Sequence, residues 1–260
     1  CSRCRADYGF DPVKDGELAG GERLGMREGA WAAVWARFVD APTVFPGIPE
    51  LLTRSKPAGL MFVKDAWPDE NDEAEGRLRN ALLAFDELAH GDARRRTEEL
   101  EQEHGTRRTW VWARLGRSPL AMSLSYLAVL AQRTASKMGG ETPDEMARAY
   151  AEGGYIVDEA AMCALAAVRS MADLRAVQTA VRSLYLPWLE AAAEQFQRVV
   201  AKSPLPSRGR QDDVSVPEAG CIVFADGLRF DLGQRLASKA EGRGLRVTRR
   251  HRWAALPTVT

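Results

Sequence analysis

The sequence predicts a mainly α-helical N-terminal region followed by the first strand–helix–strand (βαβ) unit of an α/β domain. Three observations lead to this fold class. Apolar residues recur at three- and four-residue spacing through most of the first 200 positions. The composition then changes abruptly at 202, to a stretch that holds three prolines and little apolar content. Beyond it, a short apolar run at 220–225 ends in Asp226-Gly227, a pattern typical of a buried strand and a turn.

The totals exclude two classes of protein. The 36 Lys and Arg residues balance the 36 Asp and Glu residues, so we expect no general electrostatic attraction to DNA or to an anionic membrane. No apolar stretch approaches the ~18 residues of a transmembrane helix. The first residue is Cys1 rather than Met, and we expect the natural start to lie upstream, which makes this chain a fragment.

Helices are expected throughout the first half of the chain, at 22–39, 72–88, 92–104 and 119–135. The first carries an apolar stripe that includes Trp35 and Phe38. The second repeats the pattern with Leu78, Leu82, Leu83 and Phe85. The third is nearly all polar, so we predict a solvated helix with His90 and His104 as ordinary surface residues. The fourth is strongly apolar.

A helix start follows at Thr142. Thr142 can cap the helix, Pro143 suits its first position, and Glu145 can complete a capping box. Gly153-Gly154 is predicted to end this helix.

Two more helices, at 158–168 and 173–200, complete a helical domain that we place at 1–201. Pro187 lies inside the second of them and is expected to kink or split it. The Pro-rich stretch 202–217 is predicted to be an interdomain linker and the first site of proteolysis, because it lacks apolar anchors.

The remaining residues, 218–260, are predicted to begin a second domain. Its expected elements are a strand, a helix and a strand at 220–225, 230–241 and 245–250. The helix is predicted to turn Leu232, Leu236 and Ala240 inward. A strand–helix–strand crossover makes both strands parallel, so both end at the same edge of the sheet.

Two residues with useful chemistry fall at that edge. Asp226 follows the first strand and Thr260 follows the second. An aspartate offers hard oxygens to Zn²⁺, Mg²⁺ or Mn²⁺, and an activated hydroxyl attacks phosphorus. The spacing alone leaves another reading open, since Asp-Gly after a strand is also an ordinary turn signal.

The cysteines indicate a reducing compartment. Cys163 and Cys221 lie in apolar runs, where buried free thiols are usual. The Cys1-x-x-Cys4 pair matches half of a zinc ribbon, but no second half follows, and a closed site needs about four ligands. We therefore expect a cytoplasmic protein without structural zinc.

The segment around Asp226 resembles a known family. Val223-Phe-Ala-Asp226-Gly-Leu-Arg-Phe-Asp231, with Leu256-Pro-Thr-Val-Thr260 downstream, is similar to the opening of the alkaline-phosphatase superfamily, including the nucleotide pyrophosphatase/phosphodiesterases. It resembles most the PglZ family of BREX phage-defence systems, in which such a pair follows a long helical region. Segments of the helical part resemble that family too, namely Ala66-Trp67-Pro-Asp-Glu-Asn71, Tyr150-Ala-Glu-Gly-Gly154 and Leu184-Tyr-Leu-Pro-Trp-Leu-Glu190.

This resemblance implies roles for particular residues. Asp226 would be a metal ligand, and Thr260 the metal-activated nucleophile, with Thr258 as the second choice. Arg229 would either steady the sheet edge that holds the metal or form a structural ion pair with Asp231 or another neighbour. The family uses two divalent ions whose remaining ligands follow the nucleophile, so 218–260 would be a truncated, alkaline-phosphatase-like PglZ domain without activity of its own.

Two functions from different classes follow. The first is a phosphatase or phosphodiesterase that acts in anti-phage defence, on a phosphoester or nucleic-acid substrate and beside other defence proteins. The second is a helical interaction scaffold whose phosphatase-like unit is degenerate or regulatory. The five arginines and His251 between Arg243 and Arg252 fit either guidance of a polyanion or a charged edge strand.

Overall fold

The computed structural model describes residues 2–59, 63–205, 223 and 225–250. The chain begins with a group of short helices: α1 (Ser2–Tyr8), α2 (Gly16–Met26), α3 (Trp31–Asp40), η1 (Pro42–Val44), α4 (Ile48–Ser55) and η2 (Lys64–Ala66). These helices enclose a small aromatic core, to which a later helix, α7 (Val111–Arg114), also contributes. Phe38, Trp67 and Trp112 are almost completely buried in this core.

A larger group of helices follows: α5 (Pro68–Leu83), η3 (Ala84–Glu87), α6 (His90–His104), η4 (Gly105–Thr109), α8 (Pro119–Arg133), α10 (Tyr155–Ala166) and α11 (Met171–Lys202). Their apolar faces meet in one core. One face of α8 is buried, and Leu78, Leu82 and Phe85 have no exposed surface. Leu83 was expected on the same stripe but is exposed, because it lies a quarter-turn beyond Leu82 on the helix.

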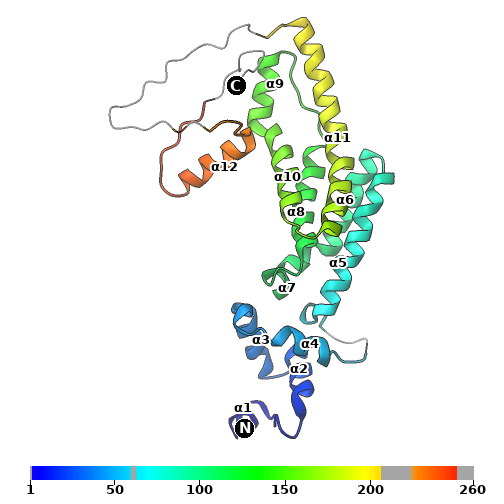
Figure 1. Cartoon of the computed structure of the whole chain (residues 1–260), viewed down its shortest axis with the longest axis vertical. Helices are drawn as coiled ribbons and strands as arrows, with labels where there is room; N and C mark the ends of the chain where they lie inside the picture. Colours follow the sequence, from blue (N-terminus) through cyan, green and yellow to red (C-terminus); the bar gives the residue numbers. More distant parts are fainter. Residues whose placement is uncertain (1, 60–62, 206–222, 224, 251–260) are drawn as a thin grey trace.

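Figure 1 shows how these groups are arranged along the longest axis. The short N-terminal helices lie at one end, and α5, α6, α8, α10 and α11 run along the middle. The last helix, α12 (Phe230–Glu241), lies beside α10 toward the other end. None of the helices described is long and apolar enough to cross a membrane.

A buried polar network joins α5 to the start of α8. The Glu75 carboxylate accepts hydrogen bonds from the Leu120 and Ala121 N–H groups at 2.8 and 3.1 Å. It also accepts one from Arg107 Nη1 at 2.7 Å, and both side chains of this ion pair are buried. Asn71 completes the network by donating to the Arg117 carbonyl at 2.7 Å and accepting from Ser118 Oγ at 2.7 Å. Glu75 therefore satisfies helix N-terminal donors from inside the protein.

The predicted helix at 22–39 is broken into α2 and α3, so its expected continuity was wrong. Arg27 adopts a left-handed conformation with φ 57°, and Gly29 follows with φ 51°. Two positive φ values within three residues cannot continue a right-handed helix. The apolar stripe itself survives the break, since Leu24, Trp35 and Phe38 all reach the aromatic core.

The polar segment 92–104 is helical, as expected, but it is not simply solvated. Ala93, Thr97, Leu100 and His104 form a buried face on α6. His104 is 3% exposed, so its predicted surface position was wrong, and His90 is half-buried. The correction follows from helical spacing, since Leu100 and His104 lie four residues apart and face the same side.

The start of α9 (Pro143–Ala149) confirms the predicted cap, because Glu145 N–H donates to Thr142 Oγ1 at 3.2 Å. The Glu145 carboxylate instead accepts from the Glu141 N–H at 2.8 Å, one residue before the cap. Gly153-Gly154 does not end the helix, contrary to the prediction. The chain continues through a π-helical turn, η5 (Tyr150–Gly154), directly into α10.

Pro187 does not split its helix either. α11 runs without interruption over 32 residues and past Pro187. Pro187 is exposed, so its ring projects to the surface while Leu184 and Trp188 hold the buried face. The helix ends at Lys202, next to the predicted linker at 202–217; residues 206–217 lie outside the described part of the chain.

The C-terminal unit matches the prediction only in its helix. α12 spans Phe230–Glu241 as expected. Residues 245–250 form no strand, and most of 220–225 lies outside the described residues. Leu232 and Leu236 are 43% and 62% exposed, so their predicted inward orientation was wrong. α12 packs against α10 through a different face, which buries Asp231 and Ala237.

Candidate functional site

The predicted metal ligand lies in the turn that leads into α12. Asp226 and Gly227 form this turn, and Gly227 has a φ of 66°, a conformation that glycine adopts without steric cost. Asp226 is exposed. Its carboxylate makes no hydrogen bond or ion pair with another residue in the described part of the chain. A free, accessible carboxylate is what a metal ligand requires.

The predicted nucleophile cannot be placed beside it. Thr260, its alternative Thr258, and His251 lie outside the described residues, as do Cys1 and Cys221. Across the residues described, no three His, Cys, Asp or Glu side chains are arranged to hold a metal ion. Asp226 therefore offers one suitable ligand rather than a complete metal site.

Arg229 pairs with Asp231, one of the two roles expected for it. Arg229 Nε donates to Asp231 Oδ1 at 3.0 Å. The Asp231 side chain is only 3% exposed, and its hydrogen bond raises the pKa of the Arg229 guanidinium. The two aspartates of the motif thus differ: Asp231 is buried and neutralised by Arg229, whereas Asp226 faces solvent.

An aromatic contact holds the start of α12 against the helical region. The Phe230 ring lies 5.6 Å from the Tyr150 ring and 5.6 Å from the Tyr155 ring, between centroids. Both pairs are tilted, as edge-to-face aromatic contacts prefer. Further along α12, Arg235 Nε lies 3.5 Å from Glu159 Oε1 on α10.

A half-buried aspartate, Asp158, binds one of these tyrosines. Asp158 accepts hydrogen bonds from the Tyr150 hydroxyl, at 2.6 Å, and from the Tyr185 hydroxyl. Burial, followed by the bond to Asp158, raises the pKa of both phenols well above the ordinary value of 10. Both tyrosines therefore remain protonated donors at neutral pH.

This tyrosine–aspartate cluster was not predicted from the sequence, although both tyrosines lie in segments that resemble the PglZ family. Their spacing gave no sign of a shared partner, because Tyr150 and Tyr185 lie 35 positions apart. Cys163 was expected to be buried but is half-exposed, and its Sγ lies 3.8 Å from Arg235 Nη1. Burial raises the pKa of the Cys163 thiol, so it is not an activated nucleophile.

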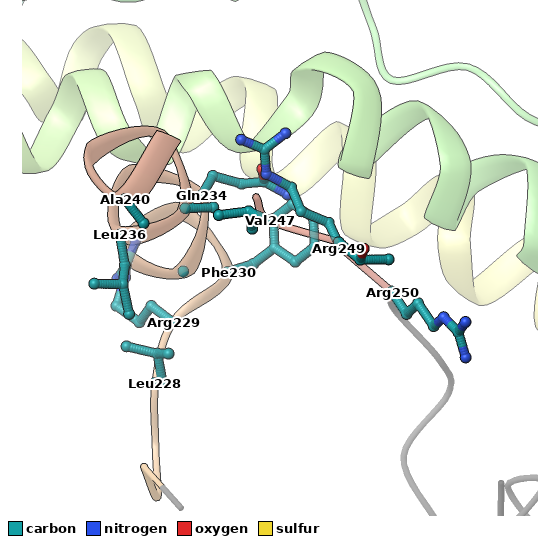
Figure 2. A pocket seen from close by; sticks show the side chains of 12 residues that line it. Leu228, Arg229, Phe230, Gln234, Leu236, Ala240, Val247, Arg249 and Arg250 are labelled. Carbon is teal, nitrogen blue, oxygen red and sulfur yellow. The ribbon is translucent and has the colours of Figure 1, made fainter. Parts of the chain in front are cut away.

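A groove of about 440 Å³ lies between α12 and the extended segment after it. Figure 2 shows its lining, in which Leu228, Leu236 and Val247 supply apolar surface. Arg229, Arg249 and Arg250 add guanidinium groups. Arg229 is already paired with Asp231, and Arg249 pairs with Glu241 at 2.6 Å. Most of the positive charge at this groove is therefore compensated within the protein.

Comparison of the chain with protein-family models, with curated proteins and with solved structures finds no match.

Proposed function

We propose that this chain is part of a metal-dependent phosphohydrolase, with Asp226 as a metal ligand and Thr260 as the nucleophile. The substrate class is a phosphate mono- or diester, and the biological setting suggested by the resemblance to the PglZ family is anti-phage defence. One observation carries the proposal: Asp226 is exposed in the turn before α12 and has no partner among the described residues, while Asp231 is buried against Arg229. Such a carboxylate is accessible to a cation.

The proposed chemistry assigns one task to each residue. Asp226 would hold a divalent cation such as Zn²⁺, Mg²⁺ or Mn²⁺ through its carboxylate oxygens. A bound cation supplies charge stabilisation and lowers the pKa of a neighbouring hydroxyl. The Thr260 hydroxyl would lose its proton and attack phosphorus, forming a new P–O bond while the ester oxygen departs with its electron pair. Water would then release the phosphate from Thr260.

A two-metal site needs roughly six ligands, and the described residues supply one. The remaining ligands would come from outside them. The predicted parallel strands at 220–225 and 245–250 belong to this proposal, because they would bring Asp226 and Thr260 to one sheet edge.

A second candidate function is an interaction scaffold. It is favoured by a row of exposed apolar side chains on α8, where Met122, Tyr126 and Val129 recur at helical spacing on the outer surface. Such a row suits a protein partner rather than a substrate. Under this alternative, the segment around Asp226 would bind no metal.

Titration with Mn²⁺ tests the proposal. Asp226→Asn should weaken Mn²⁺ binding at least about tenfold, since it replaces a charged ligand by a neutral one. Asp86→Asn is the matched control, because Asp86 is exposed but lies in the helical region. In the full-length natural protein, Thr260→Ala should abolish hydrolysis of bis(4-nitrophenyl) phosphate while Mn²⁺ binding persists. Equal Mn²⁺ binding by the Asp226→Asn variant and the unchanged protein would favour the scaffold.

A further inference from the structure

The π-helical turn η5 has a geometric effect on the residues at its two ends. Tyr155 N–H donates to the Tyr150 carbonyl, the five-residue bond of a π-helix. Residues five apart in an α-helix would be rotated by about 140° from one another. A π-helical turn is wider, so the rotation between the residues at its two ends is smaller. Tyr150 and Tyr155 consequently face the same side and both reach Phe230.

The orientation of Tyr150 is fixed from behind. Its hydroxyl donates to Asp158, about two helical turns further along on α10, and Tyr185 on α11 donates to the same carboxylate. The ring that receives Phe230 is therefore tied to both α10 and α11. This attachment makes the tyrosine pair a stiff platform rather than a flexible surface contact.

Phe230 is the matching element on α12. It is the first residue of that helix and follows Asp226 by four positions. Its two neighbours in the sequence, Arg229 and Asp231, form an ion pair with each other. On the other side of α12, Leu232 and Leu236 remain exposed, so the described contacts of this helix with the helical region lie on the Phe230 face.

We infer that η5 and Phe230 form a joint that positions the Asp226 turn on the helical region. Tyr150, Tyr155 and Phe230 are positioning residues: they contact one another rather than a substrate. Deviation of η5 from α-helical geometry is what creates the joint, in line with the frequent occurrence of π turns at functional sites. The consequence for metal binding rests on the proposed function, whereas the joint itself does not.

Hydrogen exchange of the full chain tests the joint directly. Phe230→Ala removes both ring contacts and should raise exchange of the α12 amides at least about tenfold, because each aromatic pair adds to docking beyond simple burial. Leu232→Ala is the matched control on the same helix, where an exposed leucine should change exchange less than about twofold. Phe230→Tyr keeps the ring and should resemble the unchanged protein.

Two adjacent glycines test the role of η5. A Cβ on Gly154 would lie 3.0 Å from Tyr150 Cδ2 and 3.1 Å from Met138 Sδ, whereas one on Gly153 meets nothing within 4 Å. Gly154→Ala should therefore displace Tyr150 and speed exchange in α12. Gly153→Ala, the same change one residue earlier, should not. Equal α12 exchange in all of these variants and the unchanged protein would overturn the joint.

A Mn²⁺ titration on the same proteins separates the joint from the proposed function. If Asp226 binds metal, Phe230→Ala should lower the Mn²⁺ affinity severalfold, less than Asp226→Asn does, and Phe230→Tyr should restore it. Absence of any Mn²⁺ binding in the unchanged protein would count against the phosphohydrolase alone, and exchange would still decide the joint. Faster α12 exchange with an unaltered Mn²⁺ affinity would show that the joint docks α12 without positioning Asp226.

Discussion

His104 makes the stability of this protein depend on pH. Its side chain is 3% exposed, and burial, together with nearby Arg107, lowers its pKa from 6.5 to about 4. Between pH 6.5 and about 4, His104 is therefore protonated in the unfolded chain but remains neutral in the folded chain. Stability should be lost as the pH falls from about 6.5 to 4, by up to ~3 kcal/mol from this residue.

The measurement is urea unfolding across pH 4 to 8. His104→Gln removes the titrating group, so the difference in unfolding free energy between variant and unchanged protein should vary through this pH window and be constant above it. A constant difference throughout would show that His104 titrates normally.

Glu75 should be among the residues most sensitive to substitution. Its burial raises its pKa, while the Leu120 N–H and Arg107 oppose that shift. Glu75→Ala would leave the buried Arg107 guanidinium unpaired and two N–H groups of α8 without an acceptor. We expect a loss of about 3–5 kcal/mol in urea unfolding.

A matched exposed pair gives the contrast. Glu99 accepts from Arg96 at 2.8 Å on the surface of α6. Glu99→Ala should change the unfolding free energy by less than about 1 kcal/mol. Similar losses for Glu75→Ala and Glu99→Ala would mean that the buried network contributes no more than a surface ion pair.

At the level of single helices, Pro187 allows a test of how α11 contributes to stability. α11 passes through it, so the helix lacks one backbone hydrogen bond and accommodates the ring next to the preceding turn. Pro187 is exposed, and alanine there would meet no packing constraint. Pro187→Ala should raise the unfolding free energy, by about 1–3 kcal/mol, with a corresponding rise in the melting temperature. A lower melting temperature would show that the packing of α11 requires a proline at this position.

Sequence patterns predicted the helices whose spacing and caps agree, such as α8 and the start of α9 at Thr142. They failed where backbone geometry was decided by one or two residues. The left-handed Arg27 splits α2 from α3, and η5 carries the chain through Gly153-Gly154. Arginine has no special preference for positive φ, so the sequence gives no sign of the break at Arg27. A pair of glycines is compatible both with the end of a helix and with a π-helical turn, so the sequence does not distinguish the two.

The candidate site was predictable only in part, for a related reason. A motif identifies Asp226 and Asp231 as candidates but cannot say which one is buried. That depends on α12 packing against α10, a contact between segments about 70 positions apart whose partner face is set by Tyr150 and Tyr155. The leucines at 232 and 236 misled the prediction because an amphipathic pattern shows which face is apolar, not what covers it.

At the scale of the whole molecule, the two apolar cores draw their members only from residues 24–188. α12 adds Phe230, Asp231 and Ala237 to the surface of this helical region without entering either core. The helical region should therefore fold without the C-terminal unit, whereas α12 should not be helical alone, because an isolated helix of about 12 residues is marginal in water.

Two truncated proteins test this asymmetry. A chain ending at Leu205 should keep the helical circular dichroism of α1–α11 and melt cooperatively, within a few degrees of the full chain, since the described contacts that it loses are those of α12 with α10 and η5. A peptide of residues 223–250 should show little helix by itself. Adding the peptide to the truncated chain should restore helical signal only if Phe230 is present, because docking on Tyr150 and Tyr155 supplies the tertiary contact that a short helix needs. Strong helicity of the free peptide would instead mean that α12 is stabilised by its own sequence, and that its position beside α10 is not what holds it together.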